Sequence, residues 1–121
     1  MDVLAIHKRQ IARFGGMSGI RDEGLLDSAL AQPQASFFGE LLHSTIAEQA
    51  AAYLYHLTKN HPFIDGNKRT AFATLIAFLS INGYDINLSE EEAYTLVMQT
   101  AESQITKEEI SILLARVIST K

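Results

Sequence analysis

The sequence predicts an all-α protein of about six helices, because apolar residues recur at three- and four-residue spacing along most of its length. The most apolar stretch, from Ala71 to Ile81, covers nearly the whole circumference of a helix, which indicates a buried central helix. Glycines, prolines and helix caps separate the periodic segments. We therefore expect one compact domain over residues 1–121, with a central buried helix and a short flap.

Two helices are expected in the N-terminal quarter of the chain. Residues 2–14 follow an amphipathic helical pattern, and Gly15-Gly16 after them is a stop signal. A short second helix is expected over residues 20–30, where Asp22 is a suitable N-cap. Pro33 is expected to end this helix, because proline lacks the backbone donor that a continuing helix needs.

The segment Gly15-Gly16-Met17-Ser18-Gly19 is open to two interpretations. Its glycines resemble those of a phosphate-binding loop, but the Lys-Ser/Thr ending is missing and no strand precedes it. Ordinary turn chemistry accounts for the same residues. We expect a helix cap followed by a turn.

Residues 33–42 have no clear period and predict a short hairpin or flap. They contain Phe37-Phe38-Gly39, two aromatic residues beside a turn signal. Adjacent side chains of a strand point in opposite directions, so one phenylalanine could be exposed. We expect both to pack against the core, as large apolar side chains usually do.

The second half of the chain carries clear helix-start signals. Thr45 with Glu48 is a capping-box pattern, and it opens a helix that ends near Lys59-Asn60. The central helix follows over residues 67–82, and Gly83 is its expected C-cap. After the extended residues 84–88, further capping boxes at Ser89 and Thr106 start the last two helices, and the final apolar stripe reaches Ile118.

Composition limits the function classes. The chain has no cysteine, which excludes a disulfide framework and a thiolate metal site. A net charge of −4 argues against direct binding to nucleic-acid backbone. The N-terminus does not resemble a secretory leader, and the longest apolar run is too short for a bilayer. We expect a cytoplasmic protein without a membrane partner.

The start of the central helix combines groups that can hold phosphate. A helix N-terminus presents unpaired N–H groups and about half a positive charge. Gly66 allows a phosphate to approach the backbone, and Asn67 is a suitable N-cap and donor. Lys68 and Arg69 oppose the helix dipole at this end. That local conflict is typical of a functional anion site.

The loop ahead of this helix adds the groups that phosphate transfer requires. Asp65 is placed to bind Mg²⁺ beside a phosphate, and His61 could take a proton from an attacking hydroxyl. Phe63 and Ile64 are apolar, and at least one should pin the loop to the core. Each feature alone also has a structural explanation, but together they favour an active site.

The other histidines carry weaker signals. A zinc site made of His56, His61 and Asp65 is disfavoured, because their spacing matches no helical His pair. His7 and His43 have no partner in the sequence, and we expect structural roles for both.

His-Pro-Phe-Ile-Asp-Gly-Asn-Lys-Arg-Thr, residues 61–70, resembles the signature loop of the Fic/Doc superfamily. The lysine variant is similar to the Doc, or death-on-curing, branch of toxin–antitoxin toxins. Phe14-Gly15-Gly16, the run from Gly19 to Leu26 and Asn82-Gly83-Tyr84 also resemble Doc-family segments. The resemblance implies the compact helical Fic fold over most of the chain.

This resemblance also implies an activity. Fic-type enzymes transfer part of a nucleoside triphosphate to a protein hydroxyl; most transfer AMP. The founding Doc member instead moves the γ-phosphate of ATP to a threonine of elongation factor Tu, which stops translation. By resemblance, His61 matches the general base, Asp65 the Mg²⁺ ligand and Phe63 the loop anchor. The residues that match the nucleotide and phosphate cradle are Gly66, Asn67, Lys68 and Arg69.

Three positions depart from known patterns. The AMP-transferring pattern has glycine at Lys68 and a second arginine at Phe72, and both differences favour kinase chemistry over AMP transfer. The founding Doc member usually has alanine at Gly66, which is a mild change. Self-inhibiting Fic proteins carry a Ser/Thr-x-x-x-Glu-Gly/Asn helix, and Ser44 to Gln49 is the nearest segment but ends in glutamine.

Inhibition is therefore expected from a partner, a small antitoxin whose disordered tail folds as a helix into a groove. By the same resemblance, the segment Pro33 to Leu42 matches the flap that docks the target chain. Two alternatives stay open: AMP transfer by the same loop, and a non-catalytic nucleotide-binding module that occludes a partner.

Overall fold

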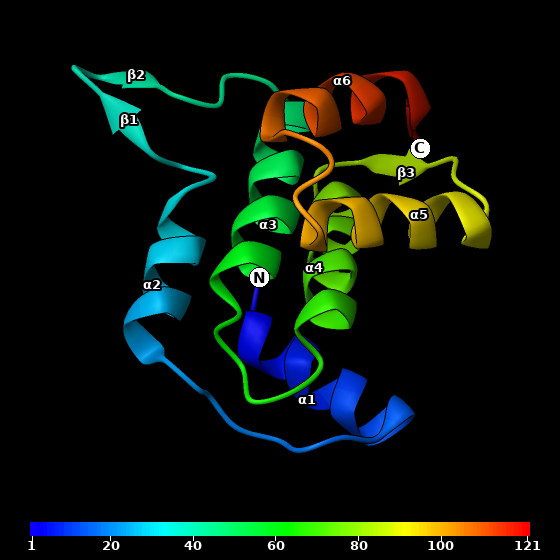
Figure 1. The fold of residues 1–121 in the computed structure, drawn as a ribbon. Helices are drawn as coiled ribbons and strands as arrows, with labels where there is room; N and C mark the ends of the chain where they lie inside the picture. The colour runs from blue at the N-terminus through cyan, green and yellow to red at the C-terminus, as the bar shows by residue number, and fades with distance from the viewer.

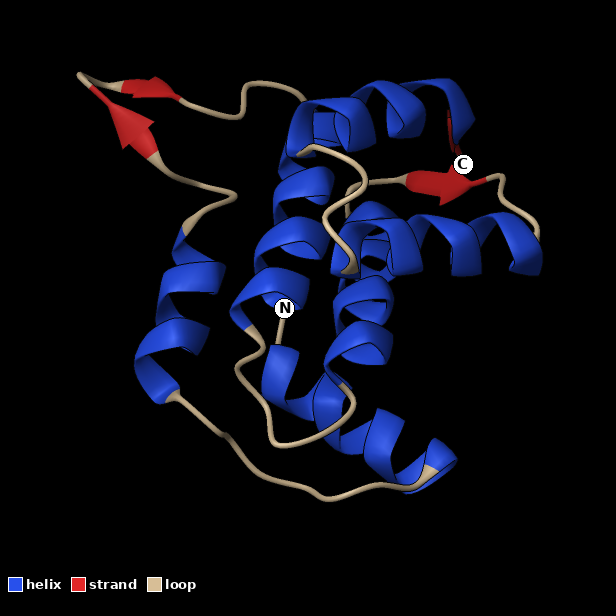
Figure 2. Cartoon of the chain, in the orientation of Figure 1, coloured by secondary structure: helices blue, strands red, loops and turns tan.

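Six helices and two short strand pairs make up the protein, as a computed structural model of residues 1–121 shows (Figures 1 and 2). The predicted all-α fold with about six helices is confirmed. The elements in chain order are α1 (Val3–Phe14), α2 (Glu23–Ala31), β1 (Ser36–Phe37), β2 (Glu40–Leu41), α3 (Ile46–Asn60), α4 (Asn67–Ile81), β3 (Tyr84–Ile86), α5 (Glu90–Ala101), α6 (Lys107–Val117) and β4 (Ile118–Thr120).

Helices α3 and α4 run side by side through the centre (Figure 1). Alanines at positions 50 and 51 of α3 are fully buried, and such small side chains let the neighbouring helix approach closely. Helix α4 contributes Leu75, Phe78 and Leu79 to the same core. The prediction that the apolar helix is buried is confirmed, and α3 shares its central position.

The remaining helices cover this pair. α1 packs against α4 and lies beside the loop that joins α3 to α4, while α2 and α6 pack against α3 and α5 contacts both central helices (Figure 1). Residues 84–86 pair antiparallel with residues 118–120, so the last predicted helix ends at Val117 and Ile118 begins a strand. No helix is both long enough and apolar enough to cross a bilayer.

Side-chain caps begin five of the six helices. The N-cap side chain accepts a backbone N–H bond at α1, α2, α3, α5 and α6, and the capping boxes at Ser89 and Thr106 are complete. At Thr45 only one half forms, since Glu48 accepts from the threonine hydroxyl rather than from its backbone. Helix α4 begins at Gly66 with no side-chain cap. Its first N–H groups are therefore left for another acceptor.

Two local predictions were wrong. Asp22 caps α2 as predicted, but the helix begins at Glu23 and does not include residues 20 and 21, because Ile20 pairs with Phe63 in an isolated β-bridge. The flap forms as the antiparallel pair β1–β2, but Phe37 and Phe38 are 65% and 92% exposed instead of packing on the core. The two-residue strands project from the bundle, so their turn has no core within reach (Figure 1).

Candidate functional site

The loop between α3 and α4 opens on a pocket of about 520 Å³. The end of α1 forms the opposite wall, because the chain there passes directly beside the start of α4. The lining residues are Phe14, Gly15, Gly16, His61, Ile64, Asp65, Gly66, Asn67, Lys68 and Arg69. The structure thus brings every polar residue predicted for the site to one pocket.

Phe63 fixes the loop to the core. Its side chain is 1% exposed, whereas that of Ile64 is 45% exposed. The ring stacks on the imidazole of His7, with 3.9 Å between ring centroids and 6° between planes. His7 Nε2 lies 2.9 Å from the carbonyl oxygen of Asp65. His7 is structural, as expected, but its role is to hold this loop from α1.

Asn67 also has a structural task that differs from the expected one. It is the first residue of α4 and not its N-cap, which is Gly66 at φ 73°. Its buried side chain accepts from the N–H of Phe63 at 2.8 Å and donates to the carbonyl of Phe63 at 2.9 Å. Both polar atoms of the amide are engaged within the loop. Only the backbone N–H of Asn67 is left for a ligand.

The start of α4 presents free backbone donors beside two cationic side chains. The backbone N–H groups of Asn67, Lys68 and Arg69 have no acceptor within the protein. A Cβ at Gly66 would lie 3.2 Å from Ile11 Cδ1 and 3.4 Å from Arg69 Nη2, so glycine keeps this approach open. The positive end of the helix dipole adds to the charges of the two side chains.

Asp65 is held as a carboxylate. Its Oδ1 accepts from the N–H of Gly66 at 2.8 Å, and its Oδ2 accepts from the N–H of Met17 at 3.2 Å. These two backbone hydrogen bonds, with a smaller contribution from the Arg69 charge, lower the pKa of Asp65. The carboxylate is exposed to the pocket, so it stays ionised and accessible at neutral pH.

The donor set fits Mg²⁺ bound together with a phosphate. No group of three or more carboxylate or histidine side chains could hold a metal ion by itself. Mg²⁺ commonly binds through one or two carboxylates, waters and substrate phosphates. Asp65 supplies such a single ligand beside the unpaired N–H groups of α4. The donor set suits a metal that arrives with a phosphate ligand better than one held in an all-protein cage.

Arg69 lines the same pocket as Asp65. Its Nη2 donates to the carbonyl of Gly15 at 3.0 Å and its Nη1 to that of Phe14 at 3.4 Å. The guanidinium carbon also lies 5.5 Å from the centroid of the Phe14 ring. These contacts orient the cation before any ligand binds. Lys68, by contrast, is exposed and makes no side-chain hydrogen bond.

His61 combines a fixed backbone with a free ring. It is the C-cap of α3 in the left-handed conformation, at φ 51° and ψ 53°. Its side chain is exposed, and neither ring nitrogen bonds to another protein atom. A ring in this state can accept a proton from an incoming hydroxyl.

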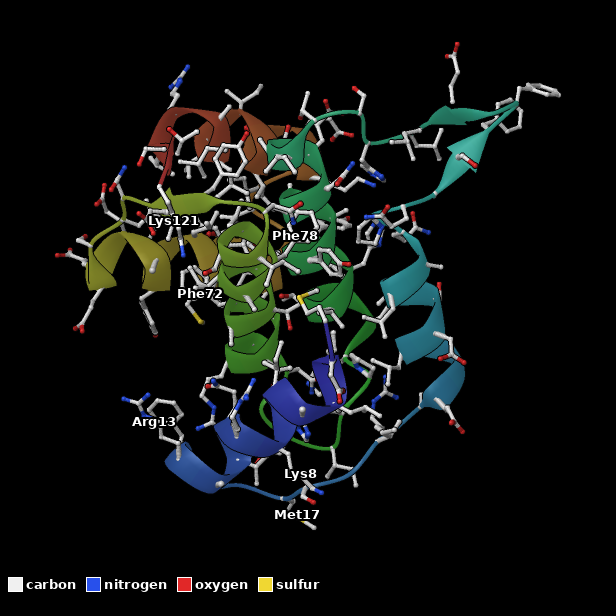
Figure 3. All side chains as sticks on the ribbon, turned by 180° about the vertical axis from the view of Figure 1, so that it is seen from behind. Lys8, Arg13, Met17, Phe72, Phe78 and Lys121 are labelled. Carbon is white, nitrogen blue, oxygen red and sulfur yellow. The ribbon has the colours of Figure 1, made fainter.

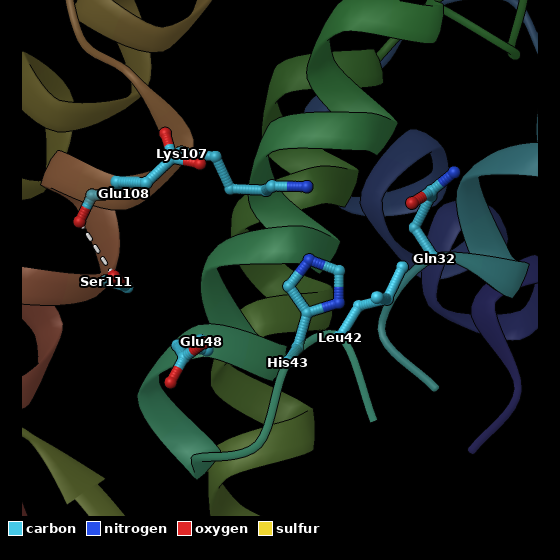
Figure 4. A pocket seen from close by; sticks show the side chains of 7 residues that line it. All are labelled: Gln32, Leu42, His43, Glu48, Lys107, Glu108 and Ser111. Atoms are coloured by element: carbon cyan, nitrogen blue, oxygen red, sulfur yellow. Dashed lines mark hydrogen bonds between the residues drawn. The ribbon is translucent and has the colours of Figure 1, made fainter. Parts of the chain in front are cut away.

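His56 and His43 lie away from this pocket. His56 Nε2 is 3.1 Å from Lys107 Nζ, and burial followed by the Lys107 charge lowers the pKa of His56 to about 4. His43 lines a second pocket near the same lysine (Figure 4). His56 therefore does not lie beside His61 and Asp65.

The buried central helix of this helical protein begins without a side-chain cap, in a pocket that a histidine and a carboxylate also line. The Fic/DOC family model matches residues 1–79. The chain belongs to the Fic/DOC family.

Two curated relatives are Doc proteins. One is "Toxin Doc" of Mycolicibacterium smegmatis, 44% identical over 84 residues, which cover 64% of this chain and 65% of the relative. The other is "Protein kinase doc" of Escherichia phage P1, 31% identical over 115 residues, which cover 95% of this chain and 90% of the relative. The chain thus spans about two thirds of one relative and nearly all of the other.

Sequence reasoning missed the contribution of the segment after α1. Gly15 is the C-cap of α1, so the expected cap is confirmed, whereas residues 16–18 are irregular rather than a turn. In the same segment, the N–H of Met17 donates to the Asp65 carboxylate, and the carbonyl of Gly15 accepts from the Arg69 guanidinium. A Cβ at Gly16 would lie 2.5 Å from Asp65 Oδ2. The paired glycines were the available signal, since two consecutive glycines permit a close approach that other residues block.

Proposed function

We propose that this protein is a Doc-like toxin that transfers a phosphate from ATP to a hydroxyl of a translation protein resembling elongation factor Tu. One observation carries the proposal: the uncapped start of α4 presents three unpaired N–H groups in the same pocket as an exposed histidine and an ionised carboxylate. The relative named as a protein kinase supports the reaction class, and the relative named as a toxin supports the biological role.

The chemistry follows from the positions of the groups. The oxygen of a Ser/Thr hydroxyl attacks the γ-phosphorus, its proton passes to the ring of His61, and ADP leaves with the electrons of the broken P–O bond. The start of α4, with Lys68 and Arg69, holds the phosphate oxygens. Mg²⁺, bound through Asp65 and the nucleotide, would neutralise charge on the phosphates.

The cations at the site favour γ-phosphate transfer over AMP transfer. Lys68 is exposed at the mouth of the pocket, where a glycine would leave more room for phosphate. Phe72 lies on the side of α4 that faces α5, in a largely apolar groove (Figure 3). No cation is therefore available at that position to clamp a second phosphate. We infer that the γ-phosphate is the one presented to His61.

The same groove suits the antitoxin helix. Its apolar wall comes from α4 and α5, and its rim carries the cations Arg13, Lys68 and Arg69. An amphipathic helix with acidic flanks would complement both features. Because Lys68 and Arg69 belong to the groove and to the phosphate pocket, such a helix would also restrict the active site. The exposed flap residues Phe37 and Phe38 would contact the target chain.

The test uses ATP labelled at either the γ or the α position, with purified elongation factor Tu as acceptor. We expect label on the acceptor from the γ position alone, and growth arrest when the protein is expressed without an antitoxin. His61→Ala should lower transfer by about 10² to 10⁴. Asp65→Ala should abolish it at ordinary Mg²⁺ concentrations.

The outcomes separate the alternatives. Label transferred only from the α position would establish AMP transfer instead. Tight ATP binding without transfer to any protein would favour a non-catalytic module. Full toxicity of His61→Ala would remove the catalytic role of this histidine.

A further inference from the structure

The backbone of His61 needs an external restraint. Its φ of 51° and ψ of 53° lie in the left-handed region, which is unfavourable for a residue with a Cβ. The last carbonyl groups of α3 also have no hydrogen-bond partner within the helix. Since the ring makes no hydrogen bond within the protein, the restraint has to act through the main chain.

Arg21 supplies that restraint from a segment 40 residues away. Its Nε donates to the carbonyl of His61 at 2.7 Å, and its Nη2 donates to the carbonyl of Asn60 at 2.9 Å. A guanidinium holds two donors in one rigid plane, so the two carbonyls are fixed relative to each other. The positive charge also lies at the negative end of the α3 dipole, where it is stabilising.

The backbone of residues 19–22 is hydrogen-bonded to the loop between α3 and α4. The N–H groups of Arg21 and Asp22 both donate to the carbonyl of Pro62, at 2.7 and 3.1 Å. Beyond this point Ile20 pairs with Phe63, and Ile64 donates to the carbonyl of Gly19 at 3.0 Å. In Figure 1 the connection between α1 and α2, which contains this segment, passes below the loop between α3 and α4.

Helix α2 anchors the segment in turn. The Asp22 side chain accepts from the N–H of Leu25 at 2.9 Å and so fixes the start of α2. Asn60 donates from its side chain to the carbonyl of Leu25 at 2.9 Å. The end of α3, the start of α2 and the catalytic loop therefore form one hydrogen-bonded unit. None of these contacts touches Lys68 or Arg69.

We propose that Arg21 is a positioning residue, which sets the place and direction of the His61 ring by holding the carbonyls of residues 60 and 61. This role rests on the proposed function, in which His61 is the general base. Arg21 itself does not contact the phosphate pocket. Its loss should therefore change the rate of proton removal and leave nucleotide binding intact.

The test compares Arg21→Ala with Arg116→Ala, an exposed arginine at the end of α6 that makes no side-chain hydrogen bond. Arg21→Ala should lower kcat for transfer to elongation factor Tu by about 10- to 100-fold, because small misplacements of a reacting group are costly. The KM and Kd for Mg²⁺–ATP should change less than about twofold. Guanidinium ion at millimolar concentration should restore part of kcat, whereas methylammonium should not.

A second readout does not depend on activity. The ring carbon–proton signals of His61 should shift in Arg21→Ala, move back on addition of guanidinium, and stay unchanged in Arg116→Ala. If the wild-type chain transfers no phosphate, the proposed function fails and these signals alone decide the role of Arg21. Unchanged His61 signals together with unchanged kcat in folded Arg21→Ala would overturn the inference. Equal loss of ATP affinity and kcat, without guanidinium rescue, would do so too.

Discussion

Two histidine regions along α3 place the same side chain in opposite environments. In the loop site, residues 61–69, His61 has an exposed ring on a restrained backbone. In the histidine–lysine cluster, formed by His43, His56 and Lys107, the rings are partly or fully covered and lie close to a cation. Burial, then Lys107, lowers the pKa of both clustered histidines.

The difference shows how the fold keeps one imidazole accessible and covers the others. A buried imidazole beside a lysine is kept neutral and is closed to a bulky hydroxyl substrate. An exposed imidazole lacks the packing that would fix its position, and in the loop site neighbouring groups fix the backbone instead. His7 and Phe63 support the loop from the core side, and Arg21 holds it at the end of α3.

Among the variants that test this comparison, Phe63→Ala should have the largest effect on stability. The side chain is almost fully buried and stacks on His7, so its removal leaves a cavity beneath the loop. We expect a loss of about 3–5 kcal/mol in the free energy of unfolding, measured by denaturant titration. Ile64→Ala is the matched control and should cost less than about 1 kcal/mol, because this neighbour is exposed. Similar losses in both variants would contradict the anchoring role of Phe63.

Gly16→Ala should have a smaller and more specific effect. The new Cβ would lie 2.5 Å from Asp65 Oδ2 at a φ of 112°, so the carboxylate or the segment has to move. We expect Mg²⁺–ATP affinity, measured by calorimetry, to fall about tenfold, or about 1.4 kcal/mol. Gly39→Ala shares a positive φ of 81° but has open space around it, so it should lose stability without losing affinity. Unchanged affinity in Gly16→Ala would separate this segment from the site.

The sequence predicted those features that depend on residues close together in the chain. The helix over residues 67–82 and the caps at Ser89 and Thr106 follow from period and cap residues a few positions apart, and the structure confirms them within a residue or so. The loop motif of residues 61–70 could likewise be identified from its own residues. The short pairing of β3 with β4 joins strands more than 30 residues apart, and no local pattern announces it.

The supports of the site could not be predicted in the same way. His7 contacts a residue 58 positions away and Arg21 one 40 positions away, so only the folded chain shows them as neighbours of the loop. Asn67 was misplaced for a different reason: an asparagine at a helix start usually caps it. Here the side chain forms two hydrogen bonds to Phe63, and a left-handed glycine takes the N-cap position.

The free energy of unfolding should decrease at acid pH because of the histidine–lysine cluster. The unfolded chain binds a proton at His56 near pH 6.5, whereas in the folded protein the pKa of His56 is about 4. Between these values the unfolded state binds more protons, so the free energy of unfolding falls as pH falls from about 6.5 to about 4. We expect a loss of about 1–2 kcal/mol, because a half-buried ring is partly screened by water. His43 contributes with the same sign, since its pKa is also lowered.

Lys107→Met tests which cause dominates this slope. Burial is the larger cause for His56, so the slope should become shallower but persist when the lysine charge is removed. Lys8→Met is the matched control, because Lys8 is exposed on α1 and its side chain makes no hydrogen bond (Figure 3). Denaturant titrations from pH 7 to about pH 4.5 would measure both. A flat profile in Lys107→Met would mean that charge and not burial keeps His56 neutral, and the two histidine regions would then differ by one lysine rather than by their depth in the fold.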